Sequence, residues 1–135
     1  MSVYVDTSAL YALLDADNIQ HSAARDAWVA LMERNEELLC SSYVLVESFA
    51  LVQARLGLAA VRTLQNDLLP VVAVHWVDQT LHEAAVSALL TAGREQLSLV
   101  DCVSFELMRR LGLRTAFTFD RHFGEQGFGC LPTSG

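Results

Sequence analysis

At 135 residues the chain has the length of one compact domain, so we expect a single domain over residues 1–135 without material for a second core. Hydrophobic residues make up 53% of the sequence and charged residues only 19%, which excludes a disordered chain and favours an oligomer. The formal net charge of −7 arises from 16 acidic and 9 basic residues, all of the latter arginine, and this balance is unusual for a nucleic-acid-binding protein.

The sequence predicts neither export nor membrane insertion. No stretch approaches the ~20 apolar residues of a membrane span, and the N-terminal segment lacks the basic and apolar regions of a signal peptide. The three cysteines, Cys40, Cys102 and Cys130, are odd in number, and their spacing does not fit a zinc site. We therefore expect a reduced, cytoplasmic protein that does not contact membranes.

The first half of the chain alternates short strand-like runs with amphipathic helical segments. The elements expected here are, in chain order, a strand over 2–6, a short helix over 9–14, a helix over 19–36 capped by Asp17 or Asn18, a strand over 38–41, a helix over 43–56 closed by Gly57, and a helix over 58–69 that ends before Pro70. This order is typical of strand–helix–strand units.

The second half continues the alternation. The expected elements are a buried strand over 71–77, a helix over 80–92 stopped at Gly93, a helix over 98–111 stopped at Gly112, a strand over 114–119, and a short strand over 128–131 within a glycine-rich tail over 124–135. Alternating strands and helices predict an α/β domain with a mainly parallel sheet. Ligands of such sheets bind beyond the carboxyl ends of the strands, where Asp6 and Asp120 are expected.

Three aspartates and one glutamate are the candidate functional residues. Asp6 and Asp120 could simply cap the segments that follow them, and Asp101 matches a capping box with Ser98. Glu47 has no such explanation, because its helical neighbours are apolar and no arginine lies three or four residues away. An unpaired carboxylate on an apolar helix face indicates a functional residue.

Considered together, the four acids predict a metal site. If their carboxylates lay within about 5 Å of one another, each ionised pair would repel by ~3 kcal/mol at an effective dielectric constant near 20. All pairs together would destabilise the fold by on the order of 20 kcal/mol as an upper bound, which exceeds the stability of a whole domain. A cation would therefore be required, and oxygen ligands favour Mg²⁺ or Mn²⁺ over zinc.

Four short segments resemble the motifs of the PIN-domain family, and within it the VapC-like toxins of VapBC toxin–antitoxin pairs. The segments lie at 5–10 (VDTSAL), 46–48 (VES), 97–102 (LSLVDC) and 118–123 (TFDRHF). Each motif is weak alone, but the four stand in the family's order and spacing along nearly the whole chain. Cys102 replaces the alanine that is common after the third acid.

The resemblance implies a three-layer α/β/α sandwich with a mainly parallel central sheet. It also implies an Mg²⁺- or Mn²⁺-dependent endoribonuclease, the toxin of a toxin–antitoxin system, with RNA as substrate and an antitoxin as partner. The acidic residues would be both the metal-binding and the catalytic set, and Ser8 would be a polar helper beside the first of them: Asp6, Glu47, Asp101 and Asp120. One or two cations would activate water and stabilise the leaving oxygen.

Basic residues and histidines give weaker signals. Four arginines flank the last two acids in sequence and are candidates for phosphate contacts, although each could equally be solvated surface: Arg109, Arg110, Arg114 and Arg121. No two histidines have the spacing of a metal-binding pair, so none is expected to be a ligand or a base. His122, beside Asp120, is expected at the surface.

The expected oligomer is a homodimer that uses the helices at 43–56 and 58–69. The second helix carries an apolar stripe that would face the partner: Leu58, Val61, Leu64 and Leu68. On this interpretation, replacing Leu64 with glutamate should split the dimer without unfolding the subunit.

Two other functions fit parts of the sequence. Phosphatases that form an aspartyl-phosphate also place an aspartate after the first strand, but they need a second acid where Ser8 stands and a lysine, which this chain lacks. The stronger alternative is a non-catalytic or degenerate module that keeps the PIN fold, and with it the metal, for binding or assembly. Turnover of RNA separates this alternative from the ribonuclease.

Overall fold

A computed structural model describes residues 1–133, and its core is one parallel β-sheet. The strands are β1 (Ser2–Val5), β2 (Glu37–Ser41), β3 (Val72–His75), β4 (Thr115–Phe117) and β5 (Gly129–Leu131). They lie in the order β3-β2-β1-β4-β5, and every neighbouring pair is parallel. The predicted mainly parallel sheet is therefore confirmed, and β1 occupies its centre.

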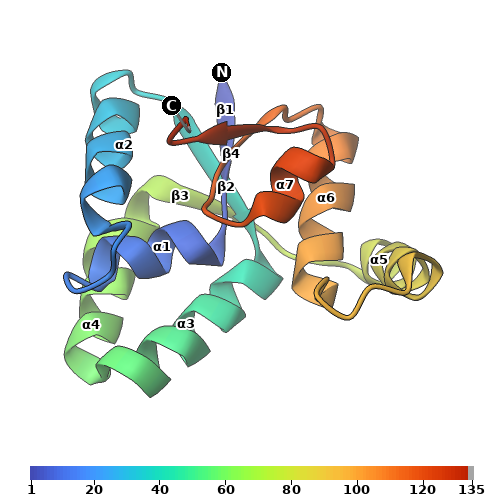
Figure 1. Cartoon of the computed structure of the whole chain (residues 1–135), viewed down its shortest axis with the longest axis horizontal. Helices are drawn as coiled ribbons and strands as arrows, with labels where there is room; N and C mark the ends of the chain where they lie inside the picture. The colour runs from blue at the N-terminus through green and yellow to red at the C-terminus, as the bar shows by residue number, and fades with distance from the viewer. Residues whose placement is uncertain (134–135) are drawn as a thin grey trace.

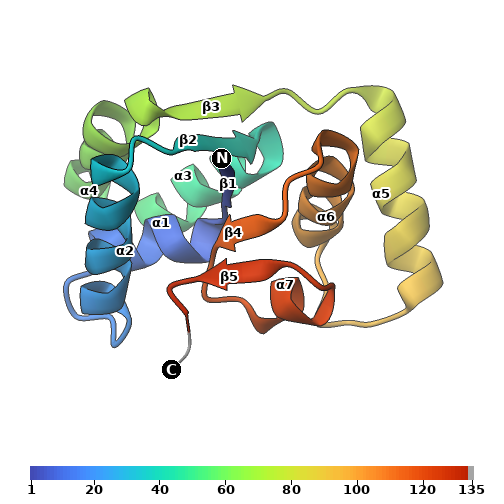
Figure 2. The same ribbon diagram turned by 90° about the horizontal axis from the view of Figure 1, so that it is seen from above.

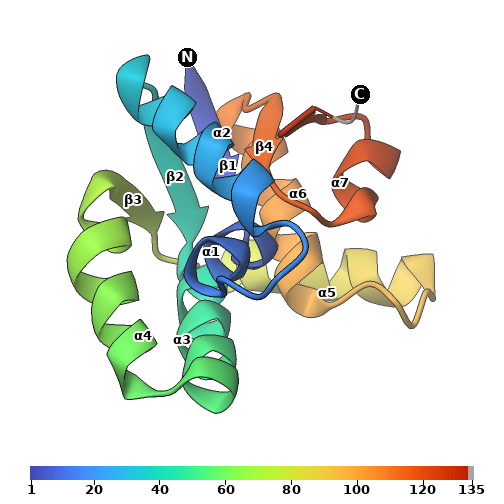
Figure 3. The ribbon, with the colours of Figure 1, turned by 60° about the vertical axis from the view of Figure 1, so that its left-hand side comes forward.

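Helices cover both faces of the sheet. They are α1 (Thr7–Leu14), α2 (His21–Glu33), α3 (Ser42–Leu56), α4 (Leu58–Thr63), α5 (Gln79–Ala92), α6 (Leu99–Leu111) and α7 (Arg121–Glu125). One layer contains α1, α2 and α4, and the other contains α5 and α6 (Figures 1 and 2). Figure 3 turns the first layer forward and shows α3 beyond the ends of β1 and β2. This three-layer α/β/α arrangement is the predicted fold class.

Burial explains why β1 forms the centre of the sheet. Val3, Tyr4 and Val5 are at most 1% exposed, as expected for a strand with helices on both faces. The apolar residues of α6 complete this core on one side, and Leu10 of α1 on the other. Among the described residues, no helix is both long and apolar enough to cross a bilayer.

The expected cap of the second helix is wrong. The helix begins at His21 rather than near residue 19, and its N-cap is Gln20, which makes no side-chain capping bond. The Asn18 side chain instead accepts a hydrogen bond from the backbone N–H of Gln20 at 2.8 Å. Asn18 thus forms a local turn ahead of the helix. The short asparagine side chain can bond the backbone N–H groups of a turn as well as those at the start of a helix.

The segment expected as one helix over 58–69 has three parts. After α4 the chain widens into a π-helical turn over Leu64–Leu68 and then tightens into a 3₁₀ turn over Leu69–Val71. Pro70 lies inside the 3₁₀ turn, at a starting position where its missing N–H leaves no bond unmade. The strand that follows is shorter than expected and forms a sheet edge, so Ala73 is exposed and the prediction of a buried strand is wrong.

The apolar stripe predicted for the dimer mostly faces the chain's own core. Leu64 is 0% exposed and Leu68 is 8% exposed, whereas Leu58 is 56% exposed. The proposal that Leu64→Glu would leave the subunit folded is therefore wrong, because it would bury a charge in the core. The last two residues of the predicted glycine-rich tail lie outside the described part of the chain.

Candidate active site

Asp6 combines a capping role with a position at the carboxyl edge of the sheet. It follows β1 directly and caps α1, where its Oδ2 accepts hydrogen bonds from the backbone N–H of Ser8 at 3.4 Å and from Ser8 Oγ at 2.7 Å. The residue is only 4% exposed. The structure thus places Ser8 beside Asp6, as predicted from the sequence.

Hydroxyl groups tie the end of β1 to the end of β4. Thr118 Oγ1 donates to Asp6 Oδ2 at 2.9 Å, and the backbone N–H of Phe119 donates to Ser8 Oγ at 2.9 Å. Thr118 Oγ1 also accepts the backbone N–H of Asp120 at 2.9 Å. The Asp6 carboxylate is therefore held in place by Ser8 of α1 and by Thr118, which follows β4.

Asp101 has the predicted capping box and also faces the site. Its backbone N–H donates to Ser98 Oγ at 3.0 Å, and its Oδ2 accepts from the backbone N–H of Ser98 at 3.1 Å. This reciprocal pair fixes the carboxylate at the N-terminus of α6. The capping and functional interpretations are thus compatible for Asp101.

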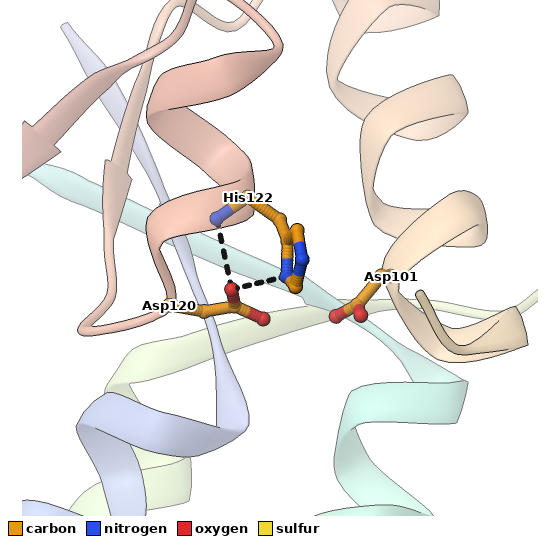
Figure 4. A group of neighbouring side chains, drawn as sticks. All are labelled: Asp101, Asp120 and His122. Atoms are coloured by element: carbon orange, nitrogen blue, oxygen red, sulfur yellow. Dashed lines mark hydrogen bonds and ion pairs between the residues drawn. The ribbon is translucent and has the colours of Figure 1, made fainter. Parts of the chain in front are cut away.

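Asp120 caps α7, a short helix that the sequence analysis did not predict. Its Oδ1 accepts from the backbone N–H of His122 at 2.9 Å and lies 2.7 Å from His122 Nδ1. His122 is 7% exposed, so its expected surface position is wrong. Figure 4 shows the imidazole beside Asp120, with the Asp101 carboxylate facing both residues. One ligand atom from each of the three residues lies within 4.8 Å of the others.

All four predicted acids line one pocket of about 330 Å³. Glu47 reaches it from α3 and is half-buried, and Thr7, Ser8 and Ser98 add hydroxyl groups to the wall. The structure therefore brings together residues that lie up to 114 positions apart in the chain. Thr118 and His122 were missed by the sequence analysis, although the Thr-Phe-Asp-Arg-His motif contains both.

Burial and the charges of neighbouring carboxylates raise the pKa of three acids in the pocket, Asp6, Glu47 and Asp101. Desolvation is the main cause that raises the pKa of Asp6 to about 6, and Asp101 and Asp120 raise it further, while the hydroxyls of Ser8 and Thr118 oppose the shift. Burial also raises the pKa of Glu47 and of Asp101. In both cases the charge of Asp120 adds to the effect.

The donor set of this pocket fits a divalent metal ion. Converging carboxylates with raised pKa values are stabilised by a cation, and carboxylate oxygens are ligands that Mg²⁺ and Mn²⁺ accept. The three ligand atoms of Asp101, Asp120 and His122 are close enough for one ion to lie near all of them. Nε2 of His122 is buried and has no hydrogen-bond partner within residues 1–133.

Most of the predicted phosphate-binding arginines lie away from the acids. Arg109 and Arg110 stand at the C-terminal end of α6, whose N-terminal end carries Asp101, about 12 Å away along the helix. Arg114 precedes β4 and is therefore at the amino edge of the sheet. Only Arg121 lies next to the site, because it follows Asp120 at the start of α7. Proximity in sequence was misleading here, since α6 and β4 carry the chain away from the pocket.

The family follows from comparison with known proteins. A model described as the PIN domain matches residues 3–129, which is nearly the whole chain. The chain belongs to the PIN-domain family. The resemblance found in the four sequence motifs is thereby confirmed, together with the fold class that it implied.

Known PIN-domain proteins similar to this chain include the 23S rRNA-specific endonuclease VapC20 of Mycobacterium tuberculosis, from two strains. It is 34% identical over 127 residues, which cover 93% of this chain and 95% of VapC20. The crystal structure of VapC20, described as a sarcin–ricin loop cleaving toxin, matches with a TM-score of 0.82 at 33% identity over 93% of this chain and 95% of that chain. This PIN-domain chain thus shares both sequence and fold with a VapC toxin.

Two more distant structures share the fold alone. FitAcB from Neisseria gonorrhoeae matches with a TM-score of 0.70 at 16% identity over 96% of both chains. VapBC2 from Rickettsia felis, bound to a DNA fragment from its promoter, matches with a TM-score of 0.71 at 13% identity over 96% of this chain and 97% of that chain. The fold of this chain is therefore also found in proteins whose sequences differ strongly from it.

Proposed function

We propose that this PIN-domain protein is a divalent-metal-dependent endoribonuclease of the VapC toxin type, and that it cuts 23S rRNA in the sarcin–ricin loop. The ribonuclease predicted from the sequence is confirmed at the level of activity class by its similarity to the endonuclease VapC20. The observation that carries the proposal is the single pocket lined by Asp6, Glu47, Asp101 and Asp120. Similarity to VapC20 supports the choice of RNA.

Each acid would have its own part in holding the metal. Asp6 is buried and fixed by Ser8 and Thr118, so its carboxylate would be a rigid ligand. Asp101 and Asp120 would bind the same ion, and Glu47, which is half-buried, would act through bound water. When bound, Mg²⁺ or Mn²⁺ would supply an activated water and stabilise the charge of the leaving oxygen.

The acidic net charge of −7 does not contradict an RNA substrate. Four of the 16 acidic residues lie in the pocket, where bound cations would neutralise them. Arg121, which follows Asp120 and lines the adjoining cavity, would contact a phosphate of the RNA. A ribosomal substrate would also agree with the cytoplasmic location expected from the sequence.

An antitoxin and a homodimer remain proposals about partners. VapC20 is described as a toxin, which supports an inhibitory partner protein for this chain.

The exposed face of α3 carries Val46, Ala50 and Ala54, which follow one another at the i, i+4 spacing, and Leu58 is exposed nearby. We propose this revised face, instead of the buried Leu64, as the surface between two copies.

The non-catalytic alternative makes a different prediction about turnover. A module that keeps the metal only for stability needs the ion at the four carboxylates but has no use for RNA in the pocket. Hydrolysis of RNA distinguishes the two functions, whereas metal binding does not.

The experiment is to treat intact ribosomes with the purified protein and map the ends of 23S rRNA by primer extension. The expected result is one cut in the sarcin–ricin loop with Mg²⁺ or Mn²⁺ and none in chelator. Asp6→Asn should abolish the cut, while the matched control Asp26→Asn, on the exposed side of α2, should leave it unchanged. Intact 23S rRNA with metal present would contradict the proposal, and cuts elsewhere would contradict the substrate.

A further inference from the structure

A second cavity, of about 560 Å³, adjoins the acid pocket on the side of β5. Its wall is formed by the segment from the end of β4 into α7, and by β5 with the residue before it and the two residues after it. Asp120 lines both cavities. A molecule that extends past Asp120 can therefore occupy the two at the same time.

Two aromatic side chains form part of the wall of this second cavity. Phe119 and Phe128 both line it, together with Pro132. Two neighbours hold the ring of Phe128 in place. It stacks on Phe105 with the ring centroids 6.1 Å apart, and its centroid lies 5.4 Å from the guanidinium carbon of Arg109. Two aromatic residues and a proline make a surface on which a planar group can stack.

Positive charge lies at the rim of the same cavity. The Arg121 side chain is 76% exposed and pairs loosely with Glu125 at 3.7 Å. Arg94, which does not line the cavity, pairs with the other oxygen of Glu125 at 3.1 Å. Exposed ion pairs of this kind contribute little to stability, so a phosphate group can compete with Glu125 for Arg121.

We propose that the second cavity receives one unpaired nucleobase of the RNA, from a nucleotide next to the bond that is cut. This inference rests on the proposed function and adds a specificity subsite to it. The cavity lies within the roughly 300–1,000 Å³ range of small-molecule pockets. Bases of unpaired RNA loops commonly stack on aromatic side chains, while arginines contact the adjoining phosphates.

Continuity with the acid pocket favours a base over a partner protein's apolar side chain. Because Asp120 lines both cavities, an occupant of the second cavity lies directly beside the Asp120 carboxylate of the acid pocket. A nucleotide whose phosphate lies at the acids must put its base, or that of its neighbour, close by. Arg121 at the rim suits a phosphodiester chain better than an apolar peptide.

The test is an abasic scan of a synthetic hairpin with the sarcin–ricin loop sequence. Each hairpin lacks one base of the loop, and kcat/KM is measured with Mn²⁺ for the wild-type protein and for Phe119→Leu. In the wild type, removal of one base beside the cut should lower kcat/KM about tenfold or more. In Phe119→Leu the intact hairpin should already be cut slowly, and removal of that base should have little further effect.

Two controls make the comparison specific. Phe119→Tyr keeps the ring and should restore the wild-type pattern. Trp76→Leu removes a 70%-exposed aromatic residue before α5, outside both cavities, and should leave the pattern unchanged. If Phe119→Leu does not fold, the scan with the wild-type protein still decides. If no single base of the loop can be removed with a loss of kcat/KM, the proposed subsite is wrong.

Failure of the subsite can be distinguished from failure of the proposed function. If the intact hairpin is cut but the effects of Phe119→Leu and of the missing base multiply independently, the subsite is wrong and the ribonuclease stands. An apolar side chain of a partner protein then becomes the better occupant. If no RNA is cut, the proposed function fails. The affinity of the protein for the same set of hairpins, measured by fluorescence anisotropy, then still tests whether the cavity binds a base.

Discussion

Nδ1 of His122 lies 2.7 Å from Oδ1 of Asp120, and the backbone N–H of His122 donates to the same oxygen at 2.9 Å. One carboxylate oxygen is therefore occupied by a single neighbouring residue. The other oxygen of Asp120 points toward Asp101 in Figure 4. His122 thus fixes the orientation in which Asp120 would meet a metal ion.

His122→Asn should weaken metal binding without unfolding the protein. Partners that orient a metal ligand typically affect metal affinity by about 10- to 100-fold when replaced, because the ligand then samples unproductive orientations. Calorimetric titration with Mn²⁺ should show a loss of at least about tenfold in affinity. The control His75→Asn, on the edge strand β3, should bind Mn²⁺ as the wild type does. Equal affinities for all three proteins would show that His122 does not orient Asp120.

Stability without metal should depend on pH through Asp6. Below about pH 4 the residue is protonated in both the folded and the unfolded states. As the pH rises, the unfolded chain releases the proton first, because burial raises the folded pKa to about 6. The free energy of unfolding should therefore decrease between about pH 4 and pH 6 by up to about 3 kcal/mol and show no further loss from Asp6 above that.

Asp6→Asn isolates this contribution. The asparagine oxygen can still accept the hydrogen bonds of Ser8 and Thr118, but the side chain does not titrate. Denaturant unfolding in chelator should show the variant gaining stability relative to the wild type as the pH rises from 4 to 6. A constant difference between the two proteins over this range would contradict a raised pKa for Asp6.

The dimer should respond to a charge at Leu58 and not to a charge at an exposed leucine elsewhere on the surface. Leu58→Asp places a charge on the exposed end of α4, so sedimentation should show a monomer that melts near the wild-type temperature. Leu90→Asp makes the same kind of change at a 75%-exposed position of α5 and should leave the dimer intact. A wild-type protein that sediments as a monomer at tens of micromolar would remove the basis for this prediction.

The sequence predicted the fold and the convergence of the four acids for physical reasons that the structure makes visible. Val3, Tyr4 and Val5 form an apolar run because β1 is covered on both faces, and such a run is easily identified. Asp6 and Asp120 both follow strands, and parallel strands bring their carboxyl ends to one edge. Glu47 stood out because nothing near it in sequence could neutralise its charge.

Other features could not be predicted because they depend on contacts between distant segments. The role of Thr118 follows from the way the end of β4 meets the end of β1. His122 contacts Asp120 only two residues away, but the short helix α7 that turns its side chain inward was not predicted. Leu64 and Leu58 look alike in the sequence, but the π-helical turn carries the former into the core. The arginines of α6 were misplaced because sequence distance from an acid does not give distance in space.

Single-turnover cleavage of the sarcin–ricin hairpin as a function of Mn²⁺ concentration tests the central claim, that the four acids form one metal-dependent active site. The wild type should be inactive in chelator, and its rate should rise with Mn²⁺ to a plateau. Asp6→Asn and Asp101→Asn should lower the plateau by at least about 100-fold, because each removes a charge that holds the metal. Cleavage by the wild type that persists in chelator, or a variant with the wild-type rate, would contradict the account.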